Sequence, residues 1–200
     1  MALCEIVDGQ RLQLSKCRRS DDELFNMLLP QNINKLTKKS FGNKHHSINI
    51  CFTNKTRKEI NEIWMKRAIT KSKKNKKDIL TFEKLEYDDN SQDVSLLAGM
   101  PIIARKHNKS LNICNNDTFK IKQINNKTQT IIITDEDKEQ TVSFNDFQTM
   151  FYVAYCITTH KSQGMTINES YTIHEFEKFD ERLKYVSLSR STNKMLINIV

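Results

Sequence analysis

The strongest constraint on the fold is a change of residue pattern near Ala98. Ahead of it, segments 11–31 and 47–69 each place a short apolar run before an amphipathic stretch, as a strand followed by a helix does. The next apolar runs are short and β-type, with Asn- and Asp-rich turns between them: MPIIAR, TFKIKQI, TQTIIIT and EQTVSF. Strand and helix patterns return after 150, so the sequence predicts an α/β domain interrupted by a β insert.

The insert is predicted to be a compact antiparallel module, for which a small barrel is the natural closure. Its edges fall near Arg105 and Met150. The predicted organisation is therefore an α/β domain in two parts, 1–104 and 151–200, with the all-β insert at 105–150.

Two helices carry start signals in the sequence. Ser20 and Glu23 have the spacing of a capping box, and Pro30 is predicted to stop the helix that follows. Thr56 and Glu59 have the same spacing ahead of a second helix. Its apolar residues recur at helical spacing and are predicted to face the core: Ile60, Ile63 and Trp64.

The formal net charge of +8 makes nucleic acid the first partner to consider, because Lys and Arg bind polyanions by releasing counterions. A basic solubility surface is the alternative, and charge alone does not separate the two. The cationic segment KSKKNKKDI at 71–79 is interpreted as a solvated loop or a fraying helix end, with nuclear import or a phosphate contact as the alternatives. No apolar run approaches the roughly 18 residues of a membrane span, and the first residues lack a secretory pattern, so no membrane partner is predicted.

The five cysteines do not form a metal-binding pattern. None belongs to a Cys-x-x-Cys pair and no His lies at ligand spacing, so no metal site is predicted. Cys51 and Cys156 lie in apolar runs and are predicted to be small core residues. Reduced thiols favour a cytoplasmic or nuclear compartment.

A polar loop, TTHKSQG at 158–164, directly follows the apolar run MFYVAYCI. Strand ends deliver loop side chains into the crevices where α/β proteins bind ligands. His160, Lys161 and the Thr and Ser hydroxyls can donate hydrogen bonds to phosphate oxygens, and Gly164 allows close approach of the backbone. The alternative is a plain connecting loop that ends at a glycine.

Two arginine positions strengthen the phosphate interpretation. Arg190 is predicted to lie one helical turn from Val186 on an otherwise apolar helix, KYVSLSRS, where burying a guanidinium is costly unless it meets an anion. A structural arginine–carboxylate pair is the alternative there. Arg18 and Arg19 lie in the loop that enters a capped helix, a favourable position for an anion. The two arginine segments and the polar loop together predict a shared phosphate ligand.

These segments resemble motifs of superfamily-1 helicases, most closely the 5′-to-3′ branch with the RecD, Dda and Pif-type enzymes. AYCITTHKSQGMTI resembles motif V, YVSLSRS resembles motif VI, and LSKCRRSDDELF resembles motif IV. CFTNKTRKEIN is similar to the TN segment that follows motif IV. LLAGMPIIARKHNKSLNICNNDTFKI is similar to the stretch that leads into the inserted Src-homology-3-like barrel. The resemblance covers nearly the whole chain, and motifs V and VI are its specific parts.

The resemblance implies the second RecA-like motor domain of an ATP-driven DNA helicase, with an inserted small β-barrel, acting in DNA replication or repair. Arg190 would be the arginine finger, and Arg19 would be a second contact to the γ-phosphate of ATP. Gln163 and Gly164 would couple the nucleotide to the strand. The residues implied to hold single-stranded DNA are Thr53, Asn54, Thr159, His160, Lys161 and Ser162. The Lys-, Asn- and Ile-rich composition is compatible with an AT-rich viral genome.

The chain departs from a complete helicase because it lacks the phosphate-binding loop G-x-x-x-x-G-K-[ST]. Its glycines, Gly9, Gly42, Gly99 and Gly164, are too far apart to form one. Mg²⁺ would be held mainly by an N-terminal RecA-like domain of the same or a companion chain, so this segment is expected to be inactive alone. The alternatives are a non-catalytic module that binds single strands and a degenerate remnant with a regulatory role.

Overall fold

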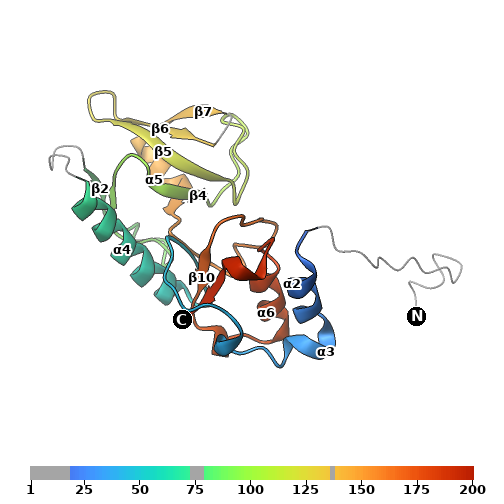
Figure 1. Cartoon of the computed structure of the whole chain (residues 1–200). Coiled ribbons are helices and arrows are strands. Elements are labelled where there is room, and N and C mark those ends of the chain that lie inside the picture. The colour runs from blue at the N-terminus through green and yellow to red at the C-terminus, as the bar shows by residue number, and fades with distance from the viewer. Residues whose placement is uncertain (1–18, 73–78, 136–137) are drawn as a thin grey trace, which may run out of the picture.

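The computed structural model describes residues 19–72, 79–135 and 138–200 (Figure 1). One half of the molecule is built on a parallel sheet in the order β11-β10-β1-β9. These strands are Ile197–Ile199, Tyr171–Ile173, Ile48–Cys51 and Cys156–Thr158. Nearly all of their residues are buried, as expected for a parallel sheet that is covered on both faces.

The two faces of the parallel sheet have different covers, because successive side chains of a strand point to opposite sides. Ile50 of β1 packs in a core with the apolar residues of three short helices. These helices are α2 (Asp22–Met27), α3 (Pro30–Ile33) and α6 (Glu181–Leu188). The next residue, Cys51, packs with Cys156 against Ile60 of the long helix α4 (Asn54–Lys71). Figure 1 shows α4 on the other side of the sheet from α2 and α6.

The other half of the molecule is an antiparallel sheet in the order β7-β6-β5-β4-β8. Its strands are Glu139–Ser143, Thr130–Thr134, Thr118–Asn125, Pro101–Ala104 and Phe151–Val153. Helix α5 (Phe144–Met150) connects β7 to β8, and a two-stranded ribbon of β2 (Leu80–Phe82) and β3 (Val94–Leu96) leads into β4. Within the described residues β7 and β8 are not paired with each other, so the sheet has two edges.

The antiparallel sheet is inserted into the parallel one. β1 precedes it and β9 follows it, yet these two strands are direct neighbours. The inserted sheet includes β4 and β8, which flank the predicted 105–150 range on either side. The α/β pattern interrupted by antiparallel strands is thus confirmed as a mixed α/β fold, and every β-type run named above from 100 onward contains a strand.

The helix starts differ from the predicted capping boxes. Asp21, rather than Ser20, caps α2, because its Oδ1 accepts the Leu24 N–H at 2.7 Å. Thr53, rather than Thr56, caps α4, and its hydroxyl oxygen accepts the Thr56 N–H at 3.2 Å. In both cases a polar residue close to the predicted one competes for the same cap, and sequence spacing does not separate them.

Two further expectations were wrong. Ile63 is 48% exposed, because the strongly polar α4 buries only one side against the sheet and leaves Ile63 at its outer edge. Pro30 does not end α2, which stops at Met27, but opens α3 at its first turn. Proline is well suited to that position, since the first helical N–H has no partner inside the helix. Arg18, the strand expected at the start of segment 11–31 and most of the 71–79 run lie outside the described residues.

Candidate functional site

The polar loop 159–164 follows β9 at the carboxyl edge of the parallel sheet. Thr159 and Ser162 are buried in it. The Thr159 hydroxyl donates to the Cys51 carbonyl at 3.1 Å, and the Ser162 hydroxyl donates to the Thr159 carbonyl at 2.7 Å. The Thr159 hydroxyl therefore ties the loop to β1, and the Ser162 hydroxyl stabilises the turn within the loop. The exposed residues of the loop are His160, Gln163 and Gly164.

Arg190 is buried just after α6, with its guanidinium among main-chain and hydroxyl oxygens. Its Nη1 donates to the Met165 carbonyl at 3.1 Å, its Nε to the Val186 carbonyl at 2.9 Å and its Nη2 to the Ser189 hydroxyl at 2.9 Å. Among the described residues, no hydrogen bond or ion pair joins Arg190 to a carboxylate. The arginine–carboxylate pair is therefore not the arrangement found there.

Arg19 reaches the same backbone from the segment before α2. Its Nη2 donates to the Met165 carbonyl at 3.2 Å and to the Thr166 hydroxyl at 2.8 Å. Gly164, directly before Met165, has a φ of +92°, a left-handed conformation that glycine adopts readily. Burial, and next the neighbouring Arg19, lower the pKa of Arg190. The two guanidiniums repel each other, and no carboxylate among the described residues neutralises them. An anion bound between them would therefore be stabilised.

A cleft of about 310 Å³ lies beside these two arginines and is called the arginine cleft below. Its lining is basic on one side and apolar on the other, where α2 meets α6. The lining residues are Arg19, Ser20, Phe25, Leu28, Leu29, Pro30, Tyr185, Ser189 and Arg190. Gln163 and Gly164 lie outside this lining, on the loop whose Met165 carbonyl both arginines contact.

A second cleft, of about 510 Å³, lies between the parallel sheet and the inserted sheet and is called the junction cleft. Three of the predicted strand contacts line it: Asn54, His160 and Lys161. The Nζ of Lys161 donates to the side-chain oxygens of Asn115 at 3.1 Å and Asn116 at 2.9 Å, both in the loop after β4. The loop after β9 thus contacts the insert through Lys161.

Thr53, another predicted strand contact, is held at the start of α4 by a carboxylate. Its backbone N–H donates to Glu175 at 2.9 Å, and the Phe52 N–H donates to the same oxygen at 3.2 Å. Burial opposes ionisation of Glu175, but hydrogen bonds from Lys178, Thr53 and Thr56 prevail and lower its pKa to about 2. An ionised Glu175 therefore fixes the turn between β1 and α4.

Several residues of the junction cleft carry no signal in the sequence. Arg57, Arg105 and Tyr152 line it, together with Asp88. No motif marks them, since they come from α4, the end of β4, β8 and the loop between β2 and β3. The pairing of β4 with β8, which sets Ile103 opposite Tyr152, brings them together. Only the topology of the insert could have identified them.

Two negative findings apply to the described part of the chain. No group of three or more His, Cys, Asp or Glu side chains is arranged to hold a metal ion in residues 19–72, 79–135 and 138–200. Over the same ranges, no helix is both long and apolar enough to cross a membrane.

Solved structures similar to this chain include those of Pif1 helicases. Bacteroides Pif1 bound to ssDNA superposes with a TM-score of 0.69 and 17% identity, over 94% of this chain and 51% of that one. Bacteroides Pif1 in complex with ADP-AlF3 and ssDNA gives 0.66 and 18%, over 94% and 51%. Pif1 helicase from Candida albicans gives 0.58 and 14%, over 96% and 57%. The chain spans about half of each of these proteins.

No protein-family model matches the chain, and no curated protein matches it in sequence. The likeness therefore rests on the three-dimensional arrangement, which these helicases share over nearly all of the described chain. The resemblance to Pif-type helicases found in the motifs is confirmed at the level of fold: the chain has the fold of about half of a Pif1 helicase.

Proposed function

We propose that this chain is the C-terminal motor portion of an ATP-dependent DNA helicase. In this role it is the second RecA-like domain, and the inserted antiparallel sheet is its Src-homology-3-like module. The proposed division is 1–104, 105–150 and 151–200, and the pairing of β4 with β8 extends the sheet of the insert to 101 and 153.

The observation that carries the proposal is the convergence of Arg19 and Arg190 on the Met165 carbonyl. The two guanidiniums share an acceptor and have no carboxylate partner among the described residues, so the donor set fits a phosphate group. Bound ATP would supply the phosphoryl group that is transferred to water, with Mg²⁺ bound mainly by a separate RecA-like domain. Arg190 would stabilise the charge that develops on that group, with Arg19 as a second contact and Gln163 and Gly164 linking this site to the strand.

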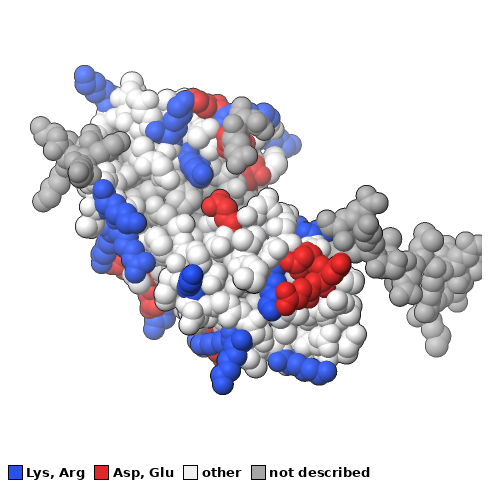
Figure 2. Space-filling model, viewed as in Figure 1, with Lys and Arg blue, Asp and Glu red and all other residues white. Residues whose placement is uncertain are grey.

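The proposed strand-binding surface runs from the start of α4 to the loop after β9. His160 and Lys161 would contact single-stranded DNA with their side chains. Asn54 lines the same cleft. Thr53, Thr159 and Ser162 would act by fixing the backbone of this surface, because their hydroxyls are engaged within the protein. Lys and Arg outnumber Glu on α4, where acidic side chains lie among the basic ones, whereas a cluster of acidic side chains lies over α2 (Figure 2). This difference supports binding of a polyanion on the α4 side.

The test is single-strand-stimulated ATP hydrolysis by this chain together with a RecA-like domain that carries the phosphate-binding loop. Arg190→Ala is expected to lower the rate by about 10³–10⁵-fold while single-strand affinity changes little. The matched control is Arg182→Ala, which removes an exposed arginine of α6, the helix that precedes Arg190. Full activity of Arg190→Ala would refute the assignment. The chain alone is expected to hydrolyse no ATP.

The alternative is a non-catalytic module that binds single strands. The junction cleft favours it, because that cleft needs no nucleotide to bind a strand. Under this alternative, single-strand binding would persist and no ATP hydrolysis would appear when a RecA-like domain is supplied.

A further inference from the structure

The junction cleft carries more positive charge than its predicted strand contacts account for. Three cationic side chains from three different elements line it: Arg57 of α4, Arg105 at the end of β4 and Lys161 after β9. Asp88 is the one carboxylate among the described residues that line it. Burial lowers the pKa of Lys161, and the nearby charges of Arg105 and Arg57 lower it further. Such crowding of like charges costs free energy unless an anion enters.

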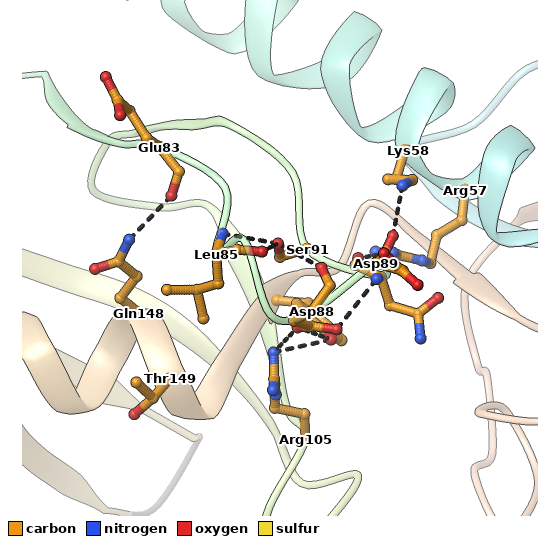
Figure 3. A network of polar contacts seen from close by, with 12 residues as sticks. Arg57, Lys58, Glu83, Leu85, Asp88, Asp89, Ser91, Arg105, Gln148 and Thr149 are labelled. Atoms are coloured by element: carbon orange, nitrogen blue, oxygen red, sulfur yellow. Dashed lines mark hydrogen bonds and ion pairs between the residues drawn. The ribbon is translucent and has the colours of Figure 1, made fainter.

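Tyr152 contacts two guanidiniums with one aromatic ring. The Arg57 guanidinium carbon lies 5.0 Å from the ring centre and that of Arg105 lies 4.9 Å from it. The Tyr152 hydroxyl donates to Asp88 at 2.7 Å and accepts from Arg105 at 2.9 Å. Arg105 also forms an ion pair with Asp88, whose loop bends toward α4 (Figure 3). Cation–π contacts of this kind hold an arginine in a defined direction.

These contacts leave part of the cation set available. All side-chain hydrogen bonds of Arg105 to described residues use Nη1, so its Nε and Nη2 have no acceptor among those residues. Among the described residues, the Lys161 ammonium is held only by neutral amide oxygens, those of Asn115 and Asn116. A phosphate oxygen is a stronger acceptor than an amide for an ammonium or a guanidinium, because the hydrogen bond is charged on both sides.

We propose that Arg105 and Lys161 form a phosphate-binding subsite in the junction cleft, which grips one strand of nucleic acid between the motor sheet and the insert. This rests on the proposed function and adds the insert to the strand-binding surface. Arg57 is a positioning residue: it packs on Tyr152, and its Nε donates to Asn54 at 3.0 Å. Asp88 orients Arg105 and at the same time opposes the entering phosphate.

The test is the salt dependence of binding to a fluorescein-labelled single-stranded oligothymidylate, measured by anisotropy with the whole 200-residue chain. Arg105→Gln and Lys161→Gln are each expected to weaken binding and to reduce the slope of log affinity against log salt by about 0.7, the value for one lost phosphate contact on a single strand. Lys106→Gln is the matched control, because it removes the exposed charge next to Arg105, outside the cleft.

Asp88→Asn separates a binding role from a structural one. It keeps an acceptor for Tyr152 and removes the only opposing charge of the cleft lining, so it is expected to tighten binding severalfold even if it lowers thermal stability. A network that merely joins the two sheets predicts lower stability with unchanged affinity. That result would overturn the subsite, and so would a salt slope of Arg105→Gln equal to that of Lys106→Gln. In either case the Lys161→Gln variant still tests the proposed function separately.

Arg105→Lys covers the case in which Arg105→Gln fails to fold, since it retains the charge beside Asp88. It is expected to keep most of the salt slope and to lose part of the affinity. A wild-type chain that shows no salt-dependent binding would overturn the proposed function, and the subsite with it.

Discussion

Arg19 and Arg190 donate hydrogen bonds to the same main-chain oxygen, that of Met165, at 3.2 and 3.1 Å. One arginine precedes α2 and the other follows α6, so the fold brings them together from nearly opposite ends of the described chain. Their shared acceptor lies directly after Gly164 of the polar loop. A change in this loop therefore reaches both guanidiniums at once.

Gly164→Ala tests how far the loop conformation matters. An added Cβ meets no atom within 4 Å, but the φ of +92° is unfavourable for alanine. We expect the free energy of unfolding to fall by roughly 1–2 kcal/mol, measured by urea denaturation, and the ATPase rate to fall as well. Gly99→Ala is the matched control, because Gly99 has a φ of +90° and equally open space. Equal ATPase rates in the two variants would contradict a role for the loop.

Glu175 gives stability a defined dependence on pH. Its pKa is lowered from 4.5 to about 2, so its contribution is complete above about pH 4.5 and is lost as the pH falls toward 2. Glu175→Gln should lower the free energy of unfolding by about 1.5–3 kcal/mol at neutral pH, with a smaller difference from wild type in acid. Denaturation at several pH values measures this. The control is Glu177→Gln, which replaces an exposed carboxylate paired with Lys38 and should change the free energy of unfolding little. If Glu175→Gln lowered the free energy of unfolding by the same amount at every pH, the role given to the ionised Glu175 would be contradicted.

The cysteines should differ sharply in reactivity. Cys51 and Cys156 are fully buried between β1, β9 and α4, and burial raises the pKa of the Cys156 thiol, whereas Cys114 is exposed. Iodoacetamide should label Cys114 in the native protein and reach the other two only in denaturant, because the thiolate is the reactive form. Peptide mass spectrometry reads this out. Rapid labelling of Cys51 in the native protein would contradict this prediction and would show that α4 separates from the sheet.

Much of the fold could be predicted from local patterns. The apolar run ahead of the 158–164 loop contains β8 and the start of β9, and each short β run of the insert contains one strand. The helix caps could not be predicted to the residue, because Ser20 and Asp21 are both good caps and the choice depends on which side chain reaches the Leu24 N–H. The exposure of Ile63 depends on how α4 is rotated against the sheet, which is a tertiary property.

The two clefts differ in what the sequence discloses. Arg19 and Arg190 could be identified because each lies in a segment with a recognisable pattern. Arg57, Arg105 and Tyr152 could not be identified from the sequence. The pairing of β4 with β8 brings Arg105 close to Tyr152, and the packing of α4 brings Arg57 to the same ring. The burial of Thr159 and Ser162 was equally out of reach, since a hydroxyl can face a ligand or a carbonyl with the same local sequence.

The central claim is that Arg19 and Arg190 act on one phosphate group. The most direct measurement is a double-mutant cycle on single-strand-stimulated ATP hydrolysis, with Arg19→Ala, Arg190→Ala and the double variant, in the presence of the RecA-like partner domain. We predict that Arg19→Ala slows hydrolysis strongly in the wild-type background and little further once Arg190 is removed. Independent, multiplying effects of the two substitutions, or a full rate in Arg190→Ala, would contradict it.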